Sequence, residues 1–393
     1  MTRSIIRLLL SVALAIAGLA ARADGFDTSA TAAYVVDVNT GTVLLDKNGD
    51  MPMPPASMSK LMTIELLFKA LSEGRVKLDS VFAVSTRAKN MGGSTMFLNE
   101  TDRPTVEQLI QGIIVLSGND ACVTVAEGLA GSEDEFARQM NARAKELGLT
   151  HSQFANASGW PDPGQLMSMH DLATLAVHII KTYPEYFHYF SQQTFAYDGR
   201  APANVENRDP LLGRVAGADG MKTGHTEASG YGLVGTAMQD GRRVLAVLNG
   251  LPTAQARAAE GERVINWAFR SFLMRKIAKS GQVIATAPVW AGDAPSVGMT
   301  VGSDVSLLVP VTAPNQVQAQ IVYSAPIQAP VAAGQKLGEM VFHFDGMEDV
   351  KVPLVATEAV AAGGFVSRLQ TAAQVLLRWV RPQQPAAPAP GAS

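Results

Sequence analysis

Apolar and polar positions follow two different spacings along the first three quarters of the chain. Two β-branched runs, 34–38 and 42–45, flank an Asn-Thr-Gly turn, and this arrangement predicts a β-hairpin. Two later runs, 230–238 and 243–248, flank an Asp-Gly turn and predict a second hairpin.

The stretch between the hairpins has the spacing of helices. Residues 58–71 are apolar nearly all round, which is typical of a helix buried inside a domain. Apolar faces or clear stop signals predict further helices at 105–116, 121–129, 133–147, 169–181 and 254–276. Strands at both ends with helices between them indicate a mostly antiparallel sheet with helices packed on it.

The pattern changes near residue 280. Short strand-like runs separated by Gly and Pro, such as 305–311, 317–323 and 340–344, predict a small all-β domain. No internal repeat is evident.

The C-terminal stretch 361–380 has apolar residues at steps of four, three, four and three. These positions are Phe365, Leu369, Ala372, Leu376 and Trp379. They form one helical face, which favours a helix lying in a membrane interface; docking on the protein's own surface is the alternative. Residues 382–393 are rich in Pro and Ala, which predicts a disordered tail.

The N-terminus has the features of an export signal. Arg3 and Arg7 accompany an apolar run, 8–20, and Ala21-Arg22-Ala23 fits a small-x-small cleavage pattern. An uncleaved membrane anchor is the alternative, although the run is short for a spanning helix. We expect the mature chain to begin near Asp24.

Composition narrows the function classes. The 393 residues carry a net charge of −3, so nothing in the charge balance calls for a nucleic-acid partner. The single cysteine, Cys122, has no intramolecular partner, and its apolar surroundings predict a small buried hydrophobe. The six histidines show no metal-ligand spacing, which argues against a zinc carboxypeptidase and leaves no metal or cofactor predicted.

Three short motifs occur in a fixed order: Ser57-Met58-Ser59-Lys60, Ser117-Gly118-Asn119 and Lys222-Thr223-Gly224. Each is common by chance, but together they indicate a serine acyltransferase whose base is a lysine. A helix that starts near Ser57 turns Ser57 and Lys60 to the same side. The apolar surroundings would desolvate Lys60 and lower its pKa, so that it can take the serine proton. The alternative for this motif is a helix cap followed by a solvated lysine.

The second and third motifs lie where side chains can face a cleft. Ser117 and Asn119 occupy a polar break between two apolar stretches and offer a hydroxyl and an amide; a plain capping loop is the alternative. Lys222 and Thr223 offer a cation and a hydroxyl to a carboxylate, and Gly224 permits close approach; an exposed turn is the alternative.

The wider phrases around these motifs resemble a known family. Proline and alanine precede the first motif, Asp-Ala follows the second, and the third stands in Asp-Gly-Met-Lys-Thr-Gly-His-Thr. A further phrase, Gly159 to Gly164 with Asp171-Leu172-Ala173, is similar as well. These look like the low-molecular-mass penicillin-binding proteins, the serine-type D-Ala-D-Ala carboxypeptidases, over essentially the whole mature chain.

The resemblance implies a fold and a set of domains. The fold is α+β, of the penicillin-binding-protein and serine β-lactamase type, with an antiparallel sheet and helices on both sides, followed by a small all-β domain. The expected divisions are a signal peptide (1–23), a catalytic domain (24–278), a β-sandwich domain (279–358), an amphipathic anchor helix (359–381) and the tail (382–393).

The resemblance also implies residue roles. Ser57 is the acylated nucleophile and Lys60 its general base, while Ser117 relays protons and Asn119 positions substrate or lysine. The oxyanion hole consists of the backbone N–H groups of Ser57 and His225. The implied substrate-binding residues are Lys222, Thr223, Gly224, His225, Arg208 and Arg257, the two arginines near the substrate carboxylate.

The implied reaction removes the terminal D-alanine from pentapeptide stems of peptidoglycan, without metal or cofactor, and β-lactams inhibit it covalently. The implied place is the periplasmic face of the bacterial inner membrane, held there by the C-terminal helix. A DD-endopeptidase and a β-lactamase of the same fold are the alternatives, and a non-catalytic wall-binding scaffold is a third. Ser-Gly-Asn in place of Ser-Asp-Asn disfavours a class A β-lactamase.

Overall fold

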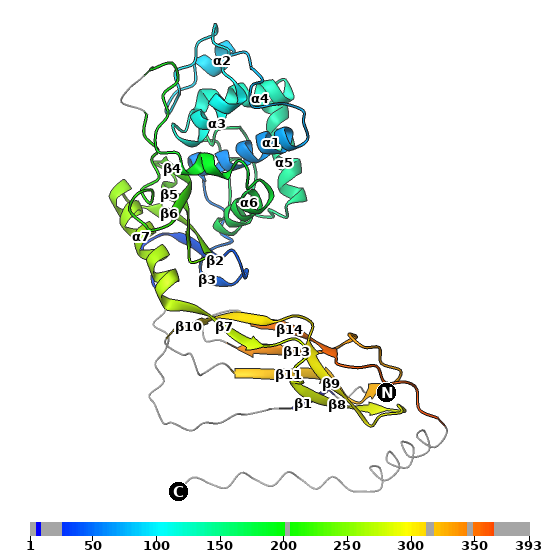
Figure 1. Ribbon diagram of the computed structural model, residues 1–393. Helices are drawn as coiled ribbons and strands as arrows, with labels where there is room; N and C mark the ends of the chain where they lie inside the picture. The colour runs from blue at the N-terminus through cyan, green and yellow to red at the C-terminus, as the bar shows by residue number, and fades with distance from the viewer. Residues whose placement is uncertain (1–4, 9–25, 201–204, 312–317, 344–348, 365–393) are drawn as a thin grey trace, which may run out of the picture. The chain divides into compact units, whose positions relative to one another are not determined.

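The computed structural model describes residues 5–8, 26–200, 205–311, 318–343 and 349–364. Its contacts divide the chain into two compact units, one covering Asp24–Phe272 and the other Met1–Ala23 together with Leu273–Ser393. Figure 1 labels the elements of both units.

A five-stranded antiparallel sheet forms the centre of the first unit. The strand order is β3-β2-β6-β5-β4, and both predicted hairpins, β2/β3 and β5/β6, are present. The strand bounds are β2 Ala32–Asp37, β3 Val43–Lys47, β4 Ala218–Thr226, β5 Gly230–Gln239 and β6 Arg242–Leu251.

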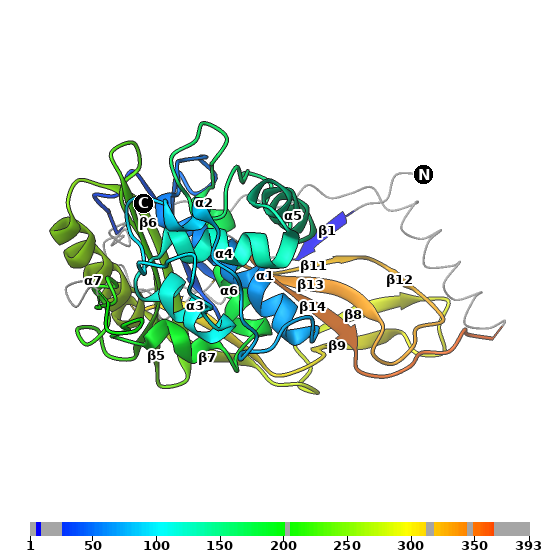
Figure 2. The same cartoon turned by 90° about the horizontal axis from the view of Figure 1, so that it is seen from above.

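Helices cover both faces of this sheet. Helix α6 packs on β2 and β6, and α7 packs on β5 and β6 from the other side, as both views show (Figures 1 and 2). The α+β class with helices on both sides of an antiparallel sheet is therefore confirmed. The helical elements are η1 Ala56–Ser59, α1 Lys60–Ser72, α2 Thr86–Lys89, α3 Val106–Ile114, α4 Asn119–Ala130, α5 Glu133–Glu146, α6 Met169–Thr182, η2 Phe187–Ser191 and α7 Ala254–Ser271.

Helix α1 is the buried axis of the helical layer. Leu61, Leu67 and Phe68 are fully enclosed, and burying each such side chain stabilises the fold by about 1.5–3 kcal/mol. Because apolar neighbours surround the helix, its first residue, Lys60, is also fully buried. Packing of α1 in the core thus fixes the position of Lys60, the last residue of the first motif.

The structure corrects one predicted element. The helix predicted over 254–276 ends at Ser271, and Phe272–Ala278 is strand β7, which pairs with β10. The sequence of β7 contains no Gly or Pro to stop a helix, but strand pairing with a distant segment outweighs local propensity.

The second unit is all-β, as predicted. Its seven-stranded sheet has the order β1-β11-β13-β14-β9-β8-β12, beside the two-stranded β10-β7. Val297, Met299, Phe342 and Leu354 lie in its core. The bounds are β1 Ile5–Leu8, β7 Phe272–Ala278, β8 Ala285–Trp290, β9 Ser296–Val301, β10 Val305–Pro310, β11 Gln318–Ser324, β12 Ile327–Gln328, β13 Lys336–His343 and β14 Val350–Ala356.

Two predicted targeting segments fall wholly or largely outside the described residues. The helix predicted over 361–380 lies beyond residue 364 for most of its length, and β1 is the described part of the predicted signal peptide. Within the described ranges, no helix combines the length and the hydrophobicity that a membrane crossing needs.

Candidate active site

Ser57 and Lys60 meet at the start of the buried helix. Ser57 lies in the 3-10 turn η1 and Lys60 begins α1, and the Nζ of Lys60 lies 2.8 Å from the Oγ of Ser57. The same Nζ donates to the Oδ1 of Asn119 at 2.7 Å and to the backbone oxygen of Ser158 at 2.5 Å. An ammonium has three protons to donate, so these three acceptors hold the group in one position.

The environment of Lys60 suits it to act as a base. Burial lowers its pKa from 10.5 to about 8, and the nearby Arg208 acts in the same direction. A measurable fraction of Lys60 is therefore neutral near pH 7–8 and able to accept the proton of the Ser57 hydroxyl.

Cys122 lies close to this lysine but stays protonated. It is fully buried on α4, and burial raises the pKa of its thiol to about 12. Because a thiol rather than a thiolate is present at neutral pH, it is a poor nucleophile. The prediction of a buried small hydrophobe is confirmed.

The second motif begins with a buried serine in an unusual backbone conformation. Ser117 adopts a left-handed backbone conformation (φ 59°), and its buried Oγ has no hydrogen-bond partner among the described residues. Such strain in a non-glycine residue is common at functional sites.

Asn119 connects the lysine to a neighbouring loop. Its Nδ2 donates to the backbone oxygen of Gly92 at 2.8 Å, and its backbone N–H donates to the oxygen of Ser94 at 2.7 Å. The buried carboxylate of Asp120 accepts from the backbone N–H groups of Met96 and Leu98. These bonds fix the loop 92–98 beside the site.

The third motif lies in strand β4, at the edge of the sheet. A Cβ on Gly224 would lie 2.8 Å from the backbone oxygen of Pro55, so only glycine lets β4 pass this close to η1. Strand β4, which contains His225, therefore contacts η1, which contains Ser57. The His225 ring stacks on Tyr231 at 3.8 Å between centroids.

Lys222 adds a second buried amine. Its Nζ donates to the backbone oxygen of Thr223 at 3.1 Å. Burial holds the pKa of Lys222 well below its usual range, with Arg208 and Lys60 acting in the same direction. The charges of the first and third motifs, on Lys60 and Lys222, are thus coupled to each other.

Both arginines named from the sequence lie near this lysine. Arg208 donates from Nη2 to the backbone oxygen of Leu116 at 2.8 Å, and the guanidinium of Arg257, on α7, lies over the ring of Tyr231. The Nε of Arg257 is buried and has no partner among the described residues. With Lys222, the arginines form a group of three cations that we call the cationic cluster.

Sequence reasoning missed Asp209, the buried acid of this cluster. Its Oδ1 accepts from the backbone N–H of Leu211 at 2.9 Å, whereas its Oδ2 has no hydrogen-bond partner among the described residues. Burial raises the pKa of Asp209 to about 6, although Arg257 and Lys222 oppose the rise. Its place directly after Arg208 was the only available signal.

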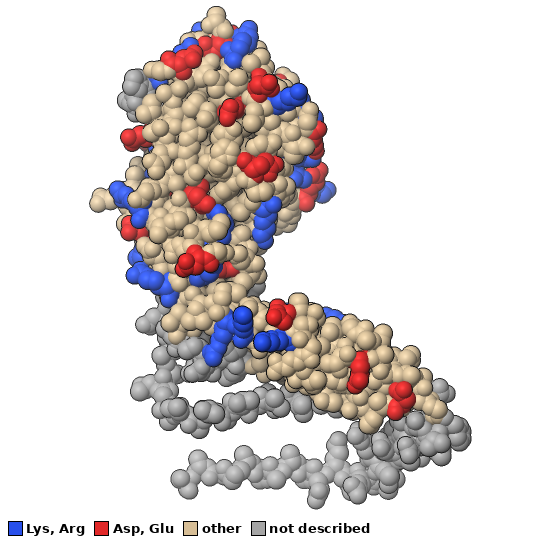
Figure 3. Space-filling model, in the orientation of Figure 1, with Lys and Arg blue, Asp and Glu red and all other residues tan. Residues whose placement is uncertain are grey.

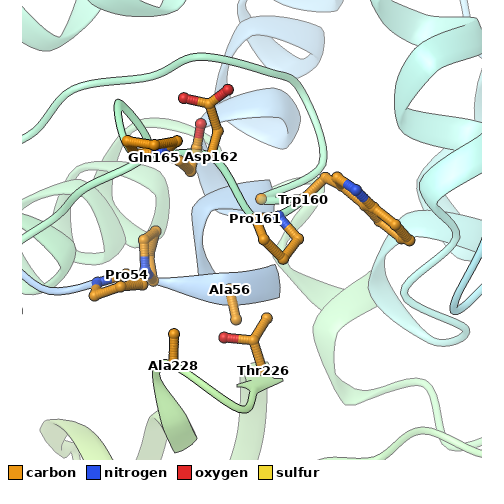
Figure 4. A pocket seen from close by; sticks show the side chains of 11 residues that line it. Pro54, Ala56, Trp160, Pro161, Asp162, Gln165, Thr226 and Ala228 are labelled. Atoms are coloured by element: carbon orange, nitrogen blue, oxygen red, sulfur yellow. The ribbon is translucent and has the colours of Figure 1, made fainter.

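A pocket of about 320 Å³ opens beside the nucleophile (Figure 4). It lies between residues 54–56, residues 159–165 and the end of β4 at Thr226. The phrase Gly159 to Gly164, singled out in the sequence, thus forms one wall of the pocket.

The surface of the first unit carries mixed charges. On the face shown in Figure 3, acidic and basic side chains are interspersed rather than gathered by sign. The described residues also include no group of three His, Cys, Asp or Glu side chains that could hold a metal ion.

A serine activated by a buried lysine, with a cationic cluster nearby, defines a serine acyl-transfer enzyme. Residues 19–253 match a family model described as D-alanyl-D-alanine carboxypeptidase, and residues 272–362 match penicillin-binding protein 5, C-terminal domain. The chain belongs to the D-alanyl-D-alanine carboxypeptidase family.

Individual relatives agree over most of their length. The chain is 33% identical to D-alanyl-D-alanine carboxypeptidase DacF of Bacillus subtilis, over 89% of this chain and 92% of that one. It is 32% identical to DacA of Escherichia coli, over 85% and 84% of the two chains.

Solved structures share the fold. The crystal structure of DacD from Francisella tularensis superposes with a TM-score of 0.77 at 27% identity, covering 89% of this chain and 98% of that one. Penicillin-binding protein 5 from Haemophilus influenzae gives 0.73 at 31% identity, with 86% and 98% covered. The predicted family, fold and enzyme class are confirmed: the chain is a serine-type D-Ala-D-Ala carboxypeptidase.

Proposed function

We propose that Ser57 carries out this reaction as the acylated nucleophile. Neutral Lys60 takes the proton of the Ser57 hydroxyl as the oxygen attacks the carbonyl between the last two D-alanines of a pentapeptide stem. The observation that carries this assignment is the 2.8 Å contact between Lys60 and Ser57, with the Lys60 pKa lowered to about 8. The negative charge that develops on the carbonyl oxygen meets the backbone N–H groups of Ser57 and His225.

Collapse of the tetrahedral intermediate breaks the bond to the leaving amine. The proton held by Lys60 passes to the nitrogen of D-alanine, and Ser117, whose hydroxyl has no hydrogen-bond partner among the described residues, relays it. Water then attacks the ester on Ser57 and gives a proton to Lys60, and this proton passes to the Ser57 oxygen as the ester bond breaks and the shortened stem is released.

The cationic cluster recognises the free carboxylate of the terminal D-alanine. Lys222 and Arg257 are buried while Arg208 is exposed, and buried cations without a matching salt bridge among the described residues favour an anionic ligand. Thr223 adds a hydroxyl, and Asn119 lies between Lys60 and the loop 92–98, where it can hold the substrate backbone.

A β-lactam would acylate Ser57 in the same way. The titles of two solved structures of penicillin-binding protein D2 from Listeria monocytogenes describe ampicillin-bound and cefotaxime-bound forms. They superpose on this chain with a TM-score of 0.57, at 31% and 32% identity, over 62% of its length. This likeness supports β-lactam binding at Ser57.

Labelling with fluorescent penicillin tests the assignment. The wild-type chain should label on the peptide that contains Ser57, as mass spectrometry of a digest would show, and should release D-alanine from a pentapeptide stem. The Ser57→Ala variant should do neither. An adduct on another residue, or trimming by Ser57→Ala, would contradict the proposal.

We place the enzyme at the periplasmic face of the bacterial inner membrane. The export signal at 1–23 and the amphipathic pattern over 361–380 support this location. A chain cut after Val360 should leave the membrane fraction and become periplasmic while still labelling with penicillin. Continued membrane association of the cut chain would count against the anchor.

A further inference from the structure

One peptide unit separates the base from the side chain of Asn156. The peptide that joins Ser158 to Gly159, here called the base-facing peptide, has its carbonyl oxygen 2.5 Å from the Nζ of Lys60. Its N–H group, on the opposite edge of the same plane, donates to the Oδ1 of Asn156 at 2.8 Å. The bond to Asn156 therefore controls the direction in which the carbonyl points.

The side chain of Asn156 is fixed at both ends of its amide. The Oδ1 also accepts from the backbone N–H groups of Ser158 at 3.1 Å and Trp160 at 3.0 Å, and the Nδ2 donates to the backbone oxygen of Trp160 at 2.9 Å. These bonds identify the oxygen end of the amide. The backbone N–H of Asn156 donates in turn to the buried side chain of Gln165 at 3.1 Å. The amide oxygen is thus held in one position against the base-facing peptide.

The base-facing peptide also packs tightly against its surroundings. Gly159 has a left-handed backbone (φ 77°), and a Cβ at this position would lie 2.0 Å from the backbone oxygen of Ala56 in η1. Only glycine allows the loop to pass this close to η1. Directly before this peptide, the backbone oxygen of Ala157 accepts from the Oγ1 of Thr63 at 2.6 Å. The loop is therefore bonded to α1 at two places one turn apart, Thr63 and Lys60.

The contacts of Lys60 assign its protons once the amine is neutral. A neutral amine has two protons and one lone pair, and three groups lie within hydrogen-bond distance of the Nζ. The Oδ1 of Asn119 at 2.7 Å and the backbone oxygen of Ser158 at 2.5 Å can only accept, so they take the two protons. The lone pair is left for the hydroxyl of Ser57 at 2.8 Å, which can donate. If the carbonyl of Ser158 turned away, a proton of the amine would be free to point at Ser57 in place of the lone pair.

We propose that Asn156, by holding the base-facing peptide, directs the lone pair of neutral Lys60 at Ser57 and is thus a positioning residue for the base. A hydrogen bond at the N–H of a peptide also polarises its carbonyl, which strengthens the bond that the carbonyl accepts. The side chain of Asn156 acts on Lys60 only through this peptide. The inference rests on the proposed function, in which Lys60 takes the proton of Ser57.

Asn156→Ala removes the acceptor of the base-facing peptide, so that its carbonyl can turn away from Lys60. The ammonium form of Lys60 then loses more than the neutral form, because hydrogen bonds from a charged group are the stronger ones. The midpoint of the acylation rate against pH should therefore move down from about 8 by about one pH unit. The plateau rate at high pH should fall about tenfold, because the lone pair is no longer aligned. Stopped-flow acylation by a chromogenic β-lactam between pH 5.5 and 9.5 measures both quantities.

Asn156→Asp is the second variant, because it keeps an oxygen for the base-facing peptide and adds a negative charge. That charge favours the ammonium form of Lys60, so the midpoint should move up while the plateau rate stays within about threefold of wild type. The other charged and titratable groups that act on Lys60 are the same in all these proteins, so two opposite shifts would come from position 156. These groups are Asp120 and Cys122 on α4, Arg208, and Lys222 on β4.

Asn141→Ala is the matched control. Asn141 holds the same loop at Phe154, where it accepts from the backbone N–H at 2.9 Å and donates to the backbone oxygen at 2.7 Å. Neither bond is to the base-facing peptide, so the control should lower the melting temperature and leave the pH midpoint where wild type has it.

The positioning role of Asn156 is overturned if Asn156→Ala keeps the wild-type midpoint, or if both Asn156 variants shift it in the same direction. Asn156→Asp decides alone where Asn156→Ala does not fold, since an unchanged or lowered midpoint in it also overturns the role. A wild-type rate that does not rise with pH up to 8 would instead contradict the proposed function.

Discussion

The Nζ of Lys60 lies 2.8 Å from the Oγ of Ser57, and both groups are held by one continuous turn of backbone that leads into α1. The hydroxyl can donate to a neutral amine or accept from an ammonium, so this contact persists through proton transfer. The buried helix thereby supplies both the base and its lowered pKa.

Replacing Lys60 by arginine keeps a cation but removes the base. A guanidinium stays protonated at any pH the protein survives, so the rate of labelling by fluorescent penicillin should fall by about 10²–10⁴-fold. Cys122→Ala is the matched control, because the thiol of Cys122 is buried, protonated and has no place in the mechanism. It should label within about threefold of wild type. Rapid labelling of Lys60→Arg would refute the role of Lys60 as base.

The lowered pKa of Lys60 also predicts how acylation depends on pH. Only the neutral amine accepts a proton, so the acylation rate should rise about tenfold per pH unit below 8 and level off above it. Stopped-flow acylation by a chromogenic β-lactam between pH 5.5 and 9.5 measures this profile. A rate that falls as pH rises through this range would show that a protonated group is required instead.

Stability should depend on pH through the same group. Between pH 8 and 10.5 the unfolded chain keeps the Lys60 proton and the folded chain has lost it, so the free energy of unfolding rises with pH. The full difference is about 3 kcal/mol, since each pKa unit is worth about 1.4 kcal/mol. Denaturant unfolding of wild type and Lys60→Met at pH 7.5 and 10.5 isolates this contribution. An unchanged difference between the two proteins would contradict the lowered pKa.

Replacing Ser117 by alanine should lower activity without lowering stability. Its hydroxyl is buried without a partner among the described residues, which costs about 1–3 kcal/mol, so Ser117→Ala should leave the melting temperature unchanged or raise it. If Ser117 relays protons, D-alanine release should fall by about 10²-fold or more in the same variant. A variant that unfolds early yet keeps its turnover would show that Ser117 is structural.

Much of the fold followed from the spacing of apolar positions, because hairpins and amphipathic helices are local patterns. Strand β7 did not, since its pairing with β10 depends on residues far along the chain. The bounds of strand β4 could not be predicted either, because around Lys222 it is rich in Gly and polar residues and has no strand alternation. Its partner β5 makes it a strand.

In the site, too, contacts between residues close in sequence could be predicted and contacts between distant residues could not. Ser57 and Lys60 are three residues apart, so their contact could be predicted from helix geometry. The backbone oxygen of Ser158, 98 positions from Lys60, has no side-chain signature and could not be. Asp209 escaped notice because a carboxylate beside an arginine normally indicates a surface ion pair.

The charge of Asp209 should lower the affinity of the cationic cluster for the substrate carboxylate. Its pKa of about 6 leaves it mostly ionised at pH 7, where its charge offsets part of the positive charge of Arg257 and Lys222. Asp209→Asn removes that charge with little change of shape and keeps an acceptor for Leu211. The KM for a peptide ending in free D-Ala-D-Ala should fall about three- to tenfold at pH 7.5.

Two comparisons make this prediction specific to charge. A peptide that ends in D-alanine amide has no carboxylate, so wild type and Asp209→Asn should bind it alike. Below pH 6 the wild-type carboxyl takes up a proton, so the two proteins should converge there with the free peptide as well. Because both comparisons alter only charge, a steric effect of the substitution would appear equally with both peptides and at every pH. A higher KM of Asp209→Asn for the free peptide would show that Asp209 orients the arginines and does not act by offsetting their positive charge.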